Sequence, residues 1–425
     1  MNTKHLIPDR INLSPDLSVQ RTASKHLKRR NGGRLPISTI QRTNSDHEGL
    51  RRRRGISMET ANMAGSSKSP SPMPDDIFVA KENFNDSSNS RDLLDLPRRQ
   101  TLQRSRPAST MSNLILLKRN AQKWFQRTIR DKGVSGLKTE FGTLHQSVEV
   151  EQSTAFHRPT NRNLNRYQDV VCLDETRVML TSGPNDYIHA NYISTPINKK
   201  RFICTQGPLD NTIVDFWRMI VQERTVKIVM LCNTIENRTR KCADYFPTRV
   251  GQTLQFDNYT IHCRMQKDLE LSKDCNQGIV IKVRGLEIVT GNQKFFCDHY
   301  QVLDWADRGV LPADLTLISL LNAVRLSKQP IVVHCSAGIG RSATIIMLEY
   351  LMELYELGES FEDTAELLEE IRDQRAFSIQ NHQQYLFVHR IFLEYLYRQK
   401  VFNTDQVVQI RKFVRDYIRA TKPSN

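Results

Sequence analysis

One short stretch of the chain combines a cysteine, an arginine and two glycines at a spacing that suits phosphate chemistry. Residues 331–342 spell IVVHCSAGIGRS. The β-branched start predicts a strand that ends at His334, and the apolar residues after Ser342 predict a helix. The loop between them can turn its backbone N–H groups inward, beside the positive end of the helix dipole. The stretch therefore predicts a phosphate cradle.

The same cradle would activate the cysteine that lies in it. Free cysteine has a pKa of about 8.5, and a helix N-terminus with nearby cations lowers this pKa by several units. We therefore expect Cys335 to be a nucleophilic thiolate, with the guanidinium of Arg341 contacting phosphate oxygens at two points. The alternative, a buried strand cysteine beside a simple turn, fits the chain's seven other cysteines better than Cys335.

The order of strand, H-C-x5-R-S and helix resembles the signature of the cysteine-dependent protein tyrosine phosphatases and matches it at every fixed position. The resemblance implies that Cys335 forms a phosphocysteine intermediate while Arg341 and the loop bind the phosphate. Ser342 would donate a hydrogen bond to the departing thiolate, and His334 would support the loop. The loop residues implied in phosphate binding are Ser336, Ala337, Gly338, Ile339 and Gly340.

A second motif, NRNLNRYQDVV at residues 161–171, resembles the substrate-recognition loop of this family. The resemblance implies that Tyr167 walls the cleft with its aromatic face, so that only a phosphate carried on an aromatic ring reaches the deep cradle. Asp169 would accept hydrogen bonds from the substrate backbone, next to Val170. Two positions depart from the family pattern: Leu164 stands where lysine is usual, and His189 stands where asparagine is usual.

A third motif, LDWADRGV at residues 303–310, resembles the family's acid loop with its Trp305. Expelling a tyrosyl oxygen of pKa about 10 requires a proton donor, and general acid catalysis contributes roughly 10²- to 10⁴-fold in rate. The resemblance makes Asp307 this general acid. Ala306 replaces the usual proline, and we expect the freer backbone to reduce the population of the closed loop.

The remaining motifs supply residues that would support the chemistry. In ENRTRKCADYFP, residues 236–247, the resemblance implies that Glu236 orients Arg341 and that Lys241 lies beside the acid loop. In QNHQQY, residues 380–385, Gln380 and Gln384 would hold the water of the second step, because amides both donate and accept. Asn381 replaces the usual threonine there. Residues 372–375 also match the family's R-x-Q-R pattern, for which we predict no role.

Composition divides the chain into an arm and a globular part. Residues 1–110 contain 20 Lys and Arg against 11 Asp and Glu, so they carry +9 of the total +15 charge, and they hold only two aromatic residues. Such a stretch buries too little apolar surface to offset its ordering entropy. We predict a disordered basic arm rich in Ser and Pro at 1–111, an N-terminal helix at 112–133, the catalytic domain at 134–400, and an amphipathic helix and tail at 401–425.

The resemblance implies an α/β fold: a single tyrosine-phosphatase-like domain with a twisted mixed β-sheet flanked by helices. Alternating apolar residues predict antiparallel strands at 253–265, 278–289 and 294–302, and an acidic amphipathic helix is predicted at 361–374. For the C-terminal helix, docking on the domain is favoured over docking on a membrane or a partner.

Charge and cysteine usage bear on partners and location. The cysteines lack zinc spacing, and a chain with a large core needs no disulfide framework. We expect no metal and no cofactor, because arginine and backbone groups meet the phosphate charge. We find no apolar run that could span a membrane. These features favour a cytoplasmic protein, with a nuclear location left open. The arm is either a solvated tail, a patch that contacts anionic surfaces or import factors, or a kinase target.

The sequence favours a protein-tyrosine phosphatase whose partners are phosphotyrosine-containing proteins, with no nucleic acid bound by the catalytic domain. A rival interpretation is a catalytically weak phosphotyrosine-binding module, a pseudophosphatase, which draws on the departures at residues 164, 189, 306 and 381. A dual-specificity or lipid phosphatase with a shallow cleft conflicts with Tyr167.

Overall fold

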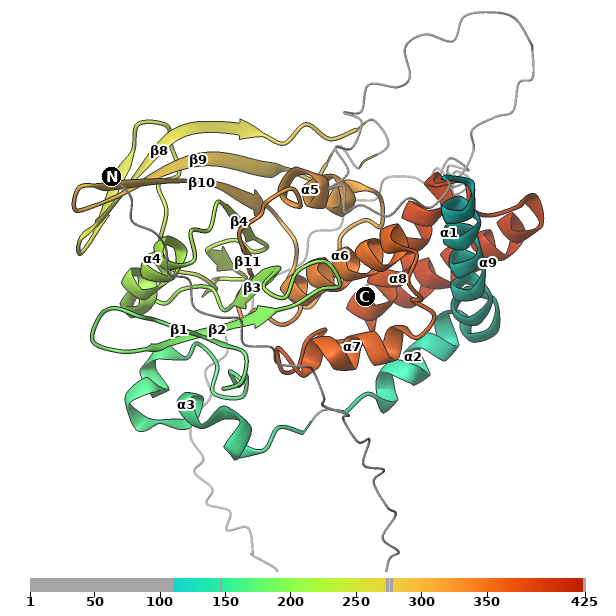
Figure 1. Ribbon diagram of the computed structural model, residues 1–425, viewed down its shortest axis with the longest axis horizontal. Coiled ribbons are helices and arrows are strands. Elements are labelled where there is room, and N and C mark those ends of the chain that lie inside the picture. Colours follow the sequence, from blue (N-terminus) through green and yellow to red (C-terminus); the bar gives the residue numbers. More distant parts are fainter. Residues whose placement is uncertain (1–109, 146, 273–274, 276–277, 423–425) are drawn as a thin grey trace, which may run out of the picture. The chain divides into compact units, whose positions relative to one another are not determined.

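A twisted mixed β-sheet carries the predicted phosphate loop at its centre (Figure 1). The computed structural model describes residues 110–145, 147–272, 275 and 278–422, so residues 1–109 of the arm predicted at 1–111 lie outside the described residues. Within the described residues the sheet has nine strands, in the order β1-β2-β3-β11-β4-β10-β9-β8-β7. Their bounds are β1 (Arg177–Met179), β2 (Tyr187–Ile193), β3 (Phe202–Thr205), β4 (Lys227–Met230), β7 (Thr253–Phe256), β8 (Tyr259–Asp268), β9 (Ile281–Thr290), β10 (Gln293–Val302) and β11 (Ile331–His334). A separate short ribbon pairs β5 (Ile235–Glu236) with β6 (Thr239–Arg240).

The central strands run parallel and the outer strands run antiparallel. β11 is parallel to β3 on one side and to β4 on the other, and β4 is parallel to β10. All four residues of β11 are buried, as expected for a β-branched strand that is covered on both faces. Because the carboxyl ends of parallel strands meet at one edge of a sheet, the loop after β11 opens at that edge. The predicted fold class is confirmed.

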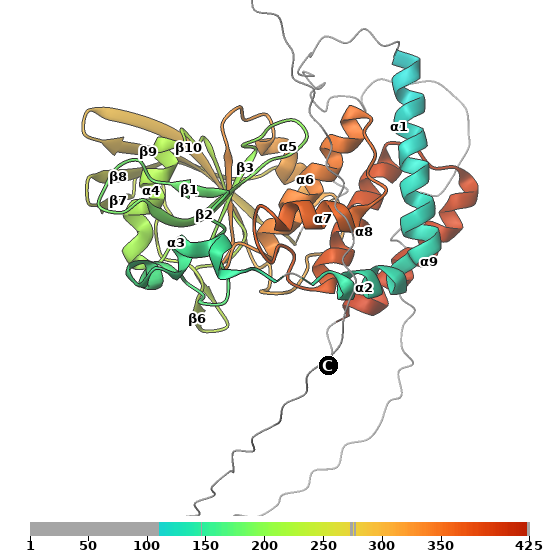
Figure 2. The ribbon, with the colours of Figure 1, turned by 60° about the horizontal axis from the view of Figure 1, so that its bottom comes forward.

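Helices cover the sheet in layers. The helices are α1 (Thr110–Trp124), a π-helical continuation (Phe125–Lys132), α2 (Gly133–Thr143), α3 (Thr154–His157), α4 (Ile213–Gln222), α5 (Thr316–Val324), α6 (Arg341–Leu357), α7 (Thr364–Arg372), α8 (His382–Arg398) and α9 (Thr404–Thr421). α6 packs against α8 and against β11 and β3. α1, α2 and α9 lie on the far side of α6 and α8 from the sheet (Figure 2).

The first and last helices join the core through aromatic and apolar side chains. Trp124 is fully buried, and its ring contacts His389 and Phe392 of α8. The chain turns at Gly133, whose φ of +57° favours glycine. In α9 the buried face carries Ile410, Phe413, Val414 and Tyr417. The domain therefore covers the apolar face of α9, which favours docking on the domain over the membrane and partner alternatives.

One predicted strand is wrong. Residues 253–265 do not form a single strand but a hairpin of β7 and β8, paired from Thr253↔His262 to Phe256↔Tyr259. The turn lies at Asp257, which has a φ of +51°. Asp and Asn tolerate this left-handed conformation and favour two-residue hairpin turns, and here Asn258 follows Asp257.

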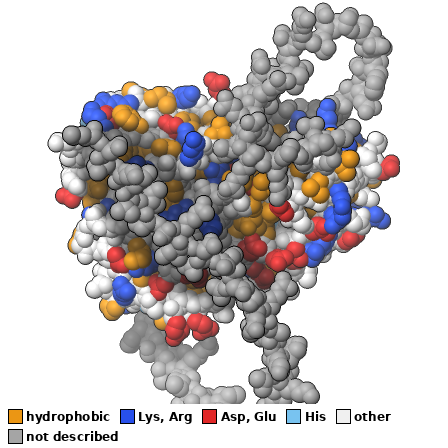
Figure 3. Space-filling view, viewed as in Figure 1, with side chains coloured by type: hydrophobic (Ala, Val, Ile, Leu, Met, Phe, Trp, Pro, Cys, Tyr) orange, Lys and Arg blue, Asp and Glu red, His pale blue; other side chains and the backbone are white. Residues whose placement is uncertain are grey.

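The predicted acidic helix corresponds to α7. The inner face of α7 buries Leu367, Leu368 and Ile371, whereas its outer face exposes Glu366 and Glu370. Acidic side chains gather over this helix on the face shown in Figure 3.

Among the described residues, no helix is long and apolar enough to cross a membrane.

Candidate active site

The loop between β11 and α6 is shaped to present its backbone N–H groups to an anion. The carbonyl oxygens of residues 336–339 all accept hydrogen bonds from outside the loop: Ser336 from the Gly207 amide at 2.9 Å, Ala337 and Gly338 from the Arg375 guanidinium at 3.0 and 3.1 Å, and Ile339 from the Ile379 amide at 2.8 Å. Because a trans peptide points its C=O and N–H in opposite directions, the amides of residues 337–340 face inward. The arrangement is a nest for a phosphate group.

Both glycines of the loop are required by close approach. Gly338 has a φ of +70°, and a side chain there would overlap the carbonyl group of Thr205. A side chain at Gly340 would overlap the side-chain amide of Gln380. Gly340 is also the residue from which α6 begins, so the helix dipole points at the nest.

Cys335 lies at the base of this nest with its residue 3% exposed. The Gly338 amide donates to Cys335 Sγ at 3.2 Å. Burial by itself opposes ionisation, but the positive charge of Arg341 and hydrogen bonds from Ser342 and Gly338 outweigh it and lower the pKa of the Cys335 thiol. The Ser342 hydroxyl has no other partner among the described residues, so it is free to donate to the thiolate. The site therefore favours a thiolate.

Arg341 is held in one orientation from two sides. Its Nη1 donates to Glu236 Oε1 at 2.6 Å and to the Trp305 carbonyl at 2.6 Å, and its Nη2 donates to Glu236 Oε2 at 3.2 Å. The two-point contact with Glu236 is the contact that the sequence motif implied. A fixed guanidinium suits bidentate binding of phosphate oxygens.

The acid loop lies over the same guanidinium. Asp307 Oδ1 is 3.4 Å from Arg341 Nη2, and Asp307 Oδ2 is 2.8 Å from Lys241 Nζ. Burial raises the pKa of the Asp307 carboxyl, but the hydrogen bond from Lys241 and the charge of Arg341 outweigh burial, so the net pKa is lowered. The Trp305 indole donates to the Gly309 carbonyl at 3.1 Å and closes the loop on itself. Ala306 lies within this turn, and its carbonyl accepts from the Gly309 amide at 3.0 Å.

The two predicted water-holding amides lie beside the nest. Gln380 and Gln384 both approach Gly340, and Gln384 Oε1 accepts from the Gln380 backbone amide at 3.1 Å. The Gln384 Nε2 atom is buried and has no partner among the described residues. A donor of this kind next to the nest can hold a water molecule or a phosphate oxygen.

The predicted substrate loop contacts the first residue of the nest, Ser336. The Tyr167 hydroxyl lies 2.8 Å from Ser336 Oγ, which itself donates to the Lys241 carbonyl at 3.1 Å. Arg166 anchors the loop by donating to the carbonyls of Gly207 at 3.0 Å and Pro208 at 2.6 Å. Asp169 is exposed on the same loop, where a substrate backbone can reach it.

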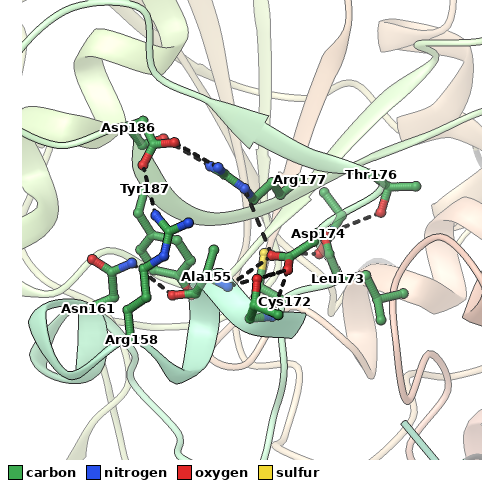
Figure 4. Close-up of polar contacts among 12 residues, drawn as sticks. Ala155, Arg158, Asn161, Cys172, Leu173, Asp174, Thr176, Arg177, Asp186 and Tyr187 are labelled. Atoms are coloured by element: carbon green, nitrogen blue, oxygen red, sulfur yellow. Dashed lines mark hydrogen bonds and ion pairs between the residues drawn. The ribbon is translucent and has the colours of Figure 1, made fainter. Parts of the chain in front are cut away.

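A polar network behind the substrate loop fixes its position (Figure 4). Asp174 accepts from the backbone amides of Thr154 at 2.6 Å and Ala155 at 3.1 Å. Arg177 lies between Asp174 and Asp186 and donates to Asp186 Oδ2 at 2.7 Å. Leu164 packs against the adjoining apolar cluster, whose members are Ala155, Phe156, Val171, Cys172, Leu173, Tyr187 and Ala376. Leucine at position 164 is thus accommodated by packing.

Sequence reasoning gave no role to His189 and Arg375, which join the two loops. His189 Nε2 donates to the Val170 carbonyl at 2.7 Å, and Arg375 Nη2 donates to His189 Nδ1 at 3.2 Å. Burial, and then the charge of Arg375, lower the pKa of His189 to about 3, so the ring is neutral. Arg375 in turn holds the phosphate loop. The only sequence signal was the match of Arg375 to the R-x-Q-R pattern.

A tyrosine that sequence reasoning also missed supports the strand that leads to the nucleophile. The Tyr245 hydroxyl lies 2.7 Å from His334 Nε2 and 2.7 Å from His299 Nε2. His334 Nδ1 donates to the Cys335 carbonyl at 3.2 Å.

Among the described residues, no group of three or more His, Cys, Asp or Glu side chains is placed to hold a metal ion.

Comparisons with known proteins agree with this geometry. The family model of protein-tyrosine phosphatases matches residues 161–394. The chain is 35% identical over 280 residues to the rat (Rattus norvegicus) tyrosine-protein phosphatase non-receptor type 9, covering 61% of this chain and 44% of that relative. It is 33% identical over 261 residues to the human non-receptor type 2 enzyme, covering 59% of this chain and 61% of the relative.

Solved structures show the same likeness. The catalytic domain of human protein tyrosine phosphatase non-receptor type 18 superposes with a TM-score of 0.52 at 26% identity, covering 67% of this chain and 98% of that one. A structure of PTPN18 in complex with HER2-pY1248 phosphopeptides gives a TM-score of 0.52 at 29% identity, covering 57% of this chain and 91% of that one. This chain belongs to the protein-tyrosine phosphatase family, and it spans less than two thirds of the length of the curated relatives named above.

Proposed function

We propose that this protein hydrolyses phosphotyrosine on proteins through a phosphocysteine intermediate. The observation that carries the proposal is the position of Cys335, a thiol of lowered pKa beneath inward-facing amides and beside the fixed guanidinium of Arg341. Oriented dipoles and a cation at this point stabilise the charge of a transferring phosphoryl group.

In the first step the Cys335 thiolate attacks phosphorus in line with the leaving oxygen. The S–P bond forms, the P–O bond breaks, and its electron pair stays on the tyrosyl oxygen, which takes the proton of Asp307. Arg341 and the loop amides bind the three non-bridging oxygens throughout.

In the second step a water molecule held by Gln380 and Gln384 attacks phosphorus. Asp307, now a carboxylate, takes the proton of this water, the S–P bond breaks, and inorganic phosphate is released. The hydroxyl of Ser342 donates to the regenerated thiolate of Cys335. At the end of the second step, Cys335 is again a thiolate and Asp307 again carries a proton, so the protein is ready for another substrate molecule.

Phosphotyrosyl proteins are the proposed partners. Tyr167 closes one side of the nest, so a phosphate must sit at the end of a long, flat side chain to reach Cys335. The PTPN18 structures with HER2 phosphopeptides support this substrate class by analogy. A reactive thiolate also needs a reducing compartment, so we place the protein in the cytoplasm. Subcellular fractionation tests this location. Loss of nuclear protein on deletion of residues 1–109 would support an import role for the arm.

The binding-module alternative draws on the same four departures as before. Two of them, Leu164 and His189, make ordinary packing and hydrogen-bond contacts, so they leave the catalytic groups in position. Phosphate release from a phosphotyrosyl peptide by the full chain decides between the two functions. We expect turnover that is abolished in Cys335→Ser and lowered at least about 10²-fold in Asp307→Asn. Peptide binding without turnover would establish the binding module instead.

A further inference from the structure

Asn381 makes two hydrogen bonds that serve different parts of the molecule. Its Oδ1 accepts from the Gln384 backbone amide at 3.0 Å, which makes it the N-cap of α8. Its Nδ2 donates to the carbonyl of Arg308 at 2.8 Å, across 73 residues of sequence. The first bond belongs to the helix alone. The second bond ties the helix start to the acid loop.

The carbonyl that Asn381 holds belongs to a strained residue. Arg308 has a φ of +57° and Asp304 has a φ of +59°, so left-handed residues flank the segment of Trp305 and Asp307 on both sides. The left-handed conformation is energetically unfavourable for a residue that carries a Cβ atom. At the other end of the segment, Asn233 Nδ2 donates to Asp304 Oδ1 at 3.0 Å. An asparagine amide therefore tethers each strained end of the acid loop.

The same tether connects the groups of both chemical steps. Asn381 follows Gln380 directly, and Gln380 and Gln384 lie over Gly340 beside the nest. The tethered loop places Asp307 over Arg341. We propose that Asn381 is a positioning residue, which holds the acid loop closed and aligns Asp307 with the phosphoryl group. This inference rests on the proposed phosphatase function and adds a residue to which the sequence motif gave no role.

The tether can be removed without removing the helix cap. In Asn381→Asp and Asn381→Ser the side chain still accepts from the Gln384 amide, because Asp and Ser are both good N-caps. A carboxylate cannot donate to the Arg308 carbonyl, and a serine hydroxyl is shorter than the asparagine amide. Serine also adds no charge near Asp307, so the pair separates loss of the hydrogen bond from a change in charge. Thermal unfolding of each full-length variant checks that the cap is kept.

The kinetic test compares two leaving groups. For a phosphotyrosyl peptide, we expect both variants to lower kcat about 3- to 10-fold, the worth of one net hydrogen bond, with KM changed less than about twofold. For p-nitrophenyl phosphate, whose leaving group is a much stronger acid than tyrosine, we expect a smaller loss. Equal losses with both substrates, or no loss with the peptide, would overturn the proposal.

A second readout does not depend on turnover. The buried Trp305 indole N–H donates to the Gly309 carbonyl within the acid loop, so its hydrogen exchange, followed by NMR and assigned with Trp305→Phe, reports loop opening. We expect exchange to be about 3- to 10-fold faster in both variants than in the wild type. Unchanged exchange would refute the tether. If the wild type shows no turnover at all, the proposed function fails, and the exchange measurement still decides the role of Asn381.

Discussion

The ammonium group of Lys241 lies 2.8 Å from the carboxylate of Asp307, so the proposed general acid rests against a cation. A general acid must carry its proton, whereas Lys241 and Arg341 favour the carboxylate and lower the pKa of Asp307 against the effect of burial. A bound phosphate dianion would add negative charge at Arg341 and raise this pKa again. We therefore expect protonation of Asp307 to depend on bound substrate.

Replacing Lys241 should therefore move the alkaline limb of the pH profile. Turnover is lost as the pH rises through the pKa of Asp307, because the proton needed for the leaving group is lost there. In Lys241→Met the cation is gone and the pKa of Asp307 rises, so the alkaline limb of kcat should shift to higher pH. The control Lys241→Arg keeps the charge and should keep the limb in place. A shift to lower pH would contradict this assignment.

Removing the Ser342 hydroxyl should move the opposite limb. The thiolate of Cys335 is required, so kcat/KM falls as the pH falls through the pKa of the thiol. Because Ser342 helps to lower that pKa, Ser342→Ala should raise it and shift the acid limb to higher pH. Ser342→Thr retains a hydroxyl and should restore the wild-type profile. An acid limb that stays unmoved in the alanine variant would exclude this role of the hydroxyl.

His189 should affect substrate binding more than turnover. His189→Ala leaves the buried carbonyl of Val170 and one Arg375 donor unpaired, which costs roughly 1–3 kcal/mol each and loosens both substrate-binding loops. We expect KM for a phosphotyrosyl peptide to rise about fivefold or more, with kcat within about twofold. His189→Asn can donate and accept at this point and should approach the wild type. A lower kcat at constant KM would argue against a role of His189 in substrate binding.

The same histidine should make the fold sensitive to acid. Its pKa is about 3 in the folded protein and 6.5 as the ordinary value, so between these values the unfolded chain binds a proton that the folded chain does not. Stability should therefore decline as the pH falls from 6.5 towards 3, and this decline should be smaller in His189→Asn. Free energies of unfolding from urea titrations at several pH values measure the difference.

Because α9 docks on the domain, removing a buried side chain from this helix should lower stability and leave kcat unchanged. Phe413 is 3% exposed, and large-to-small changes of buried phenylalanine cost about 3–5 kcal/mol. Phe413→Ala should lower the free energy of unfolding by about this amount and leave kcat unchanged below the unfolding transition. Val408→Ala on the same helix is the matched control, because Val408 is 70% exposed. Equal stabilities of the two variants would show that α9 is not docked in solution.

Local signals in the sequence were sufficient for the central strand, the glycine loop and the long helices, because each depends on residues within one segment. The hairpin of β7 and β8 was missed because apolar residues alternate on both sides of Asp257, and the shift of the alternation at the turn, from Phe256 to Tyr259, was not used. The contact of Glu236 with Arg341 could be inferred only from family resemblance, since 105 residues separate the two. The link from His189 to Arg375 had no local signature, because β2 and the loop after α7 meet only in the folded sheet.

The contact between Tyr167 and Ser336 has a consequence for how this domain folds during synthesis. The two hydroxyls meet across 169 residues of chain, and the link between His189 and Arg375 spans 186 residues. Closing such long intervals costs loop entropy before the contacts form, and contacts of this range slow folding. A nascent chain that has emerged as far as Arg341 already contains its nucleophile but lacks Arg375 and the whole of α8. In the proposed mechanism, a chain that ends before Arg375 lacks the side chain that holds the phosphate loop, so we expect no turnover of phosphotyrosine from it.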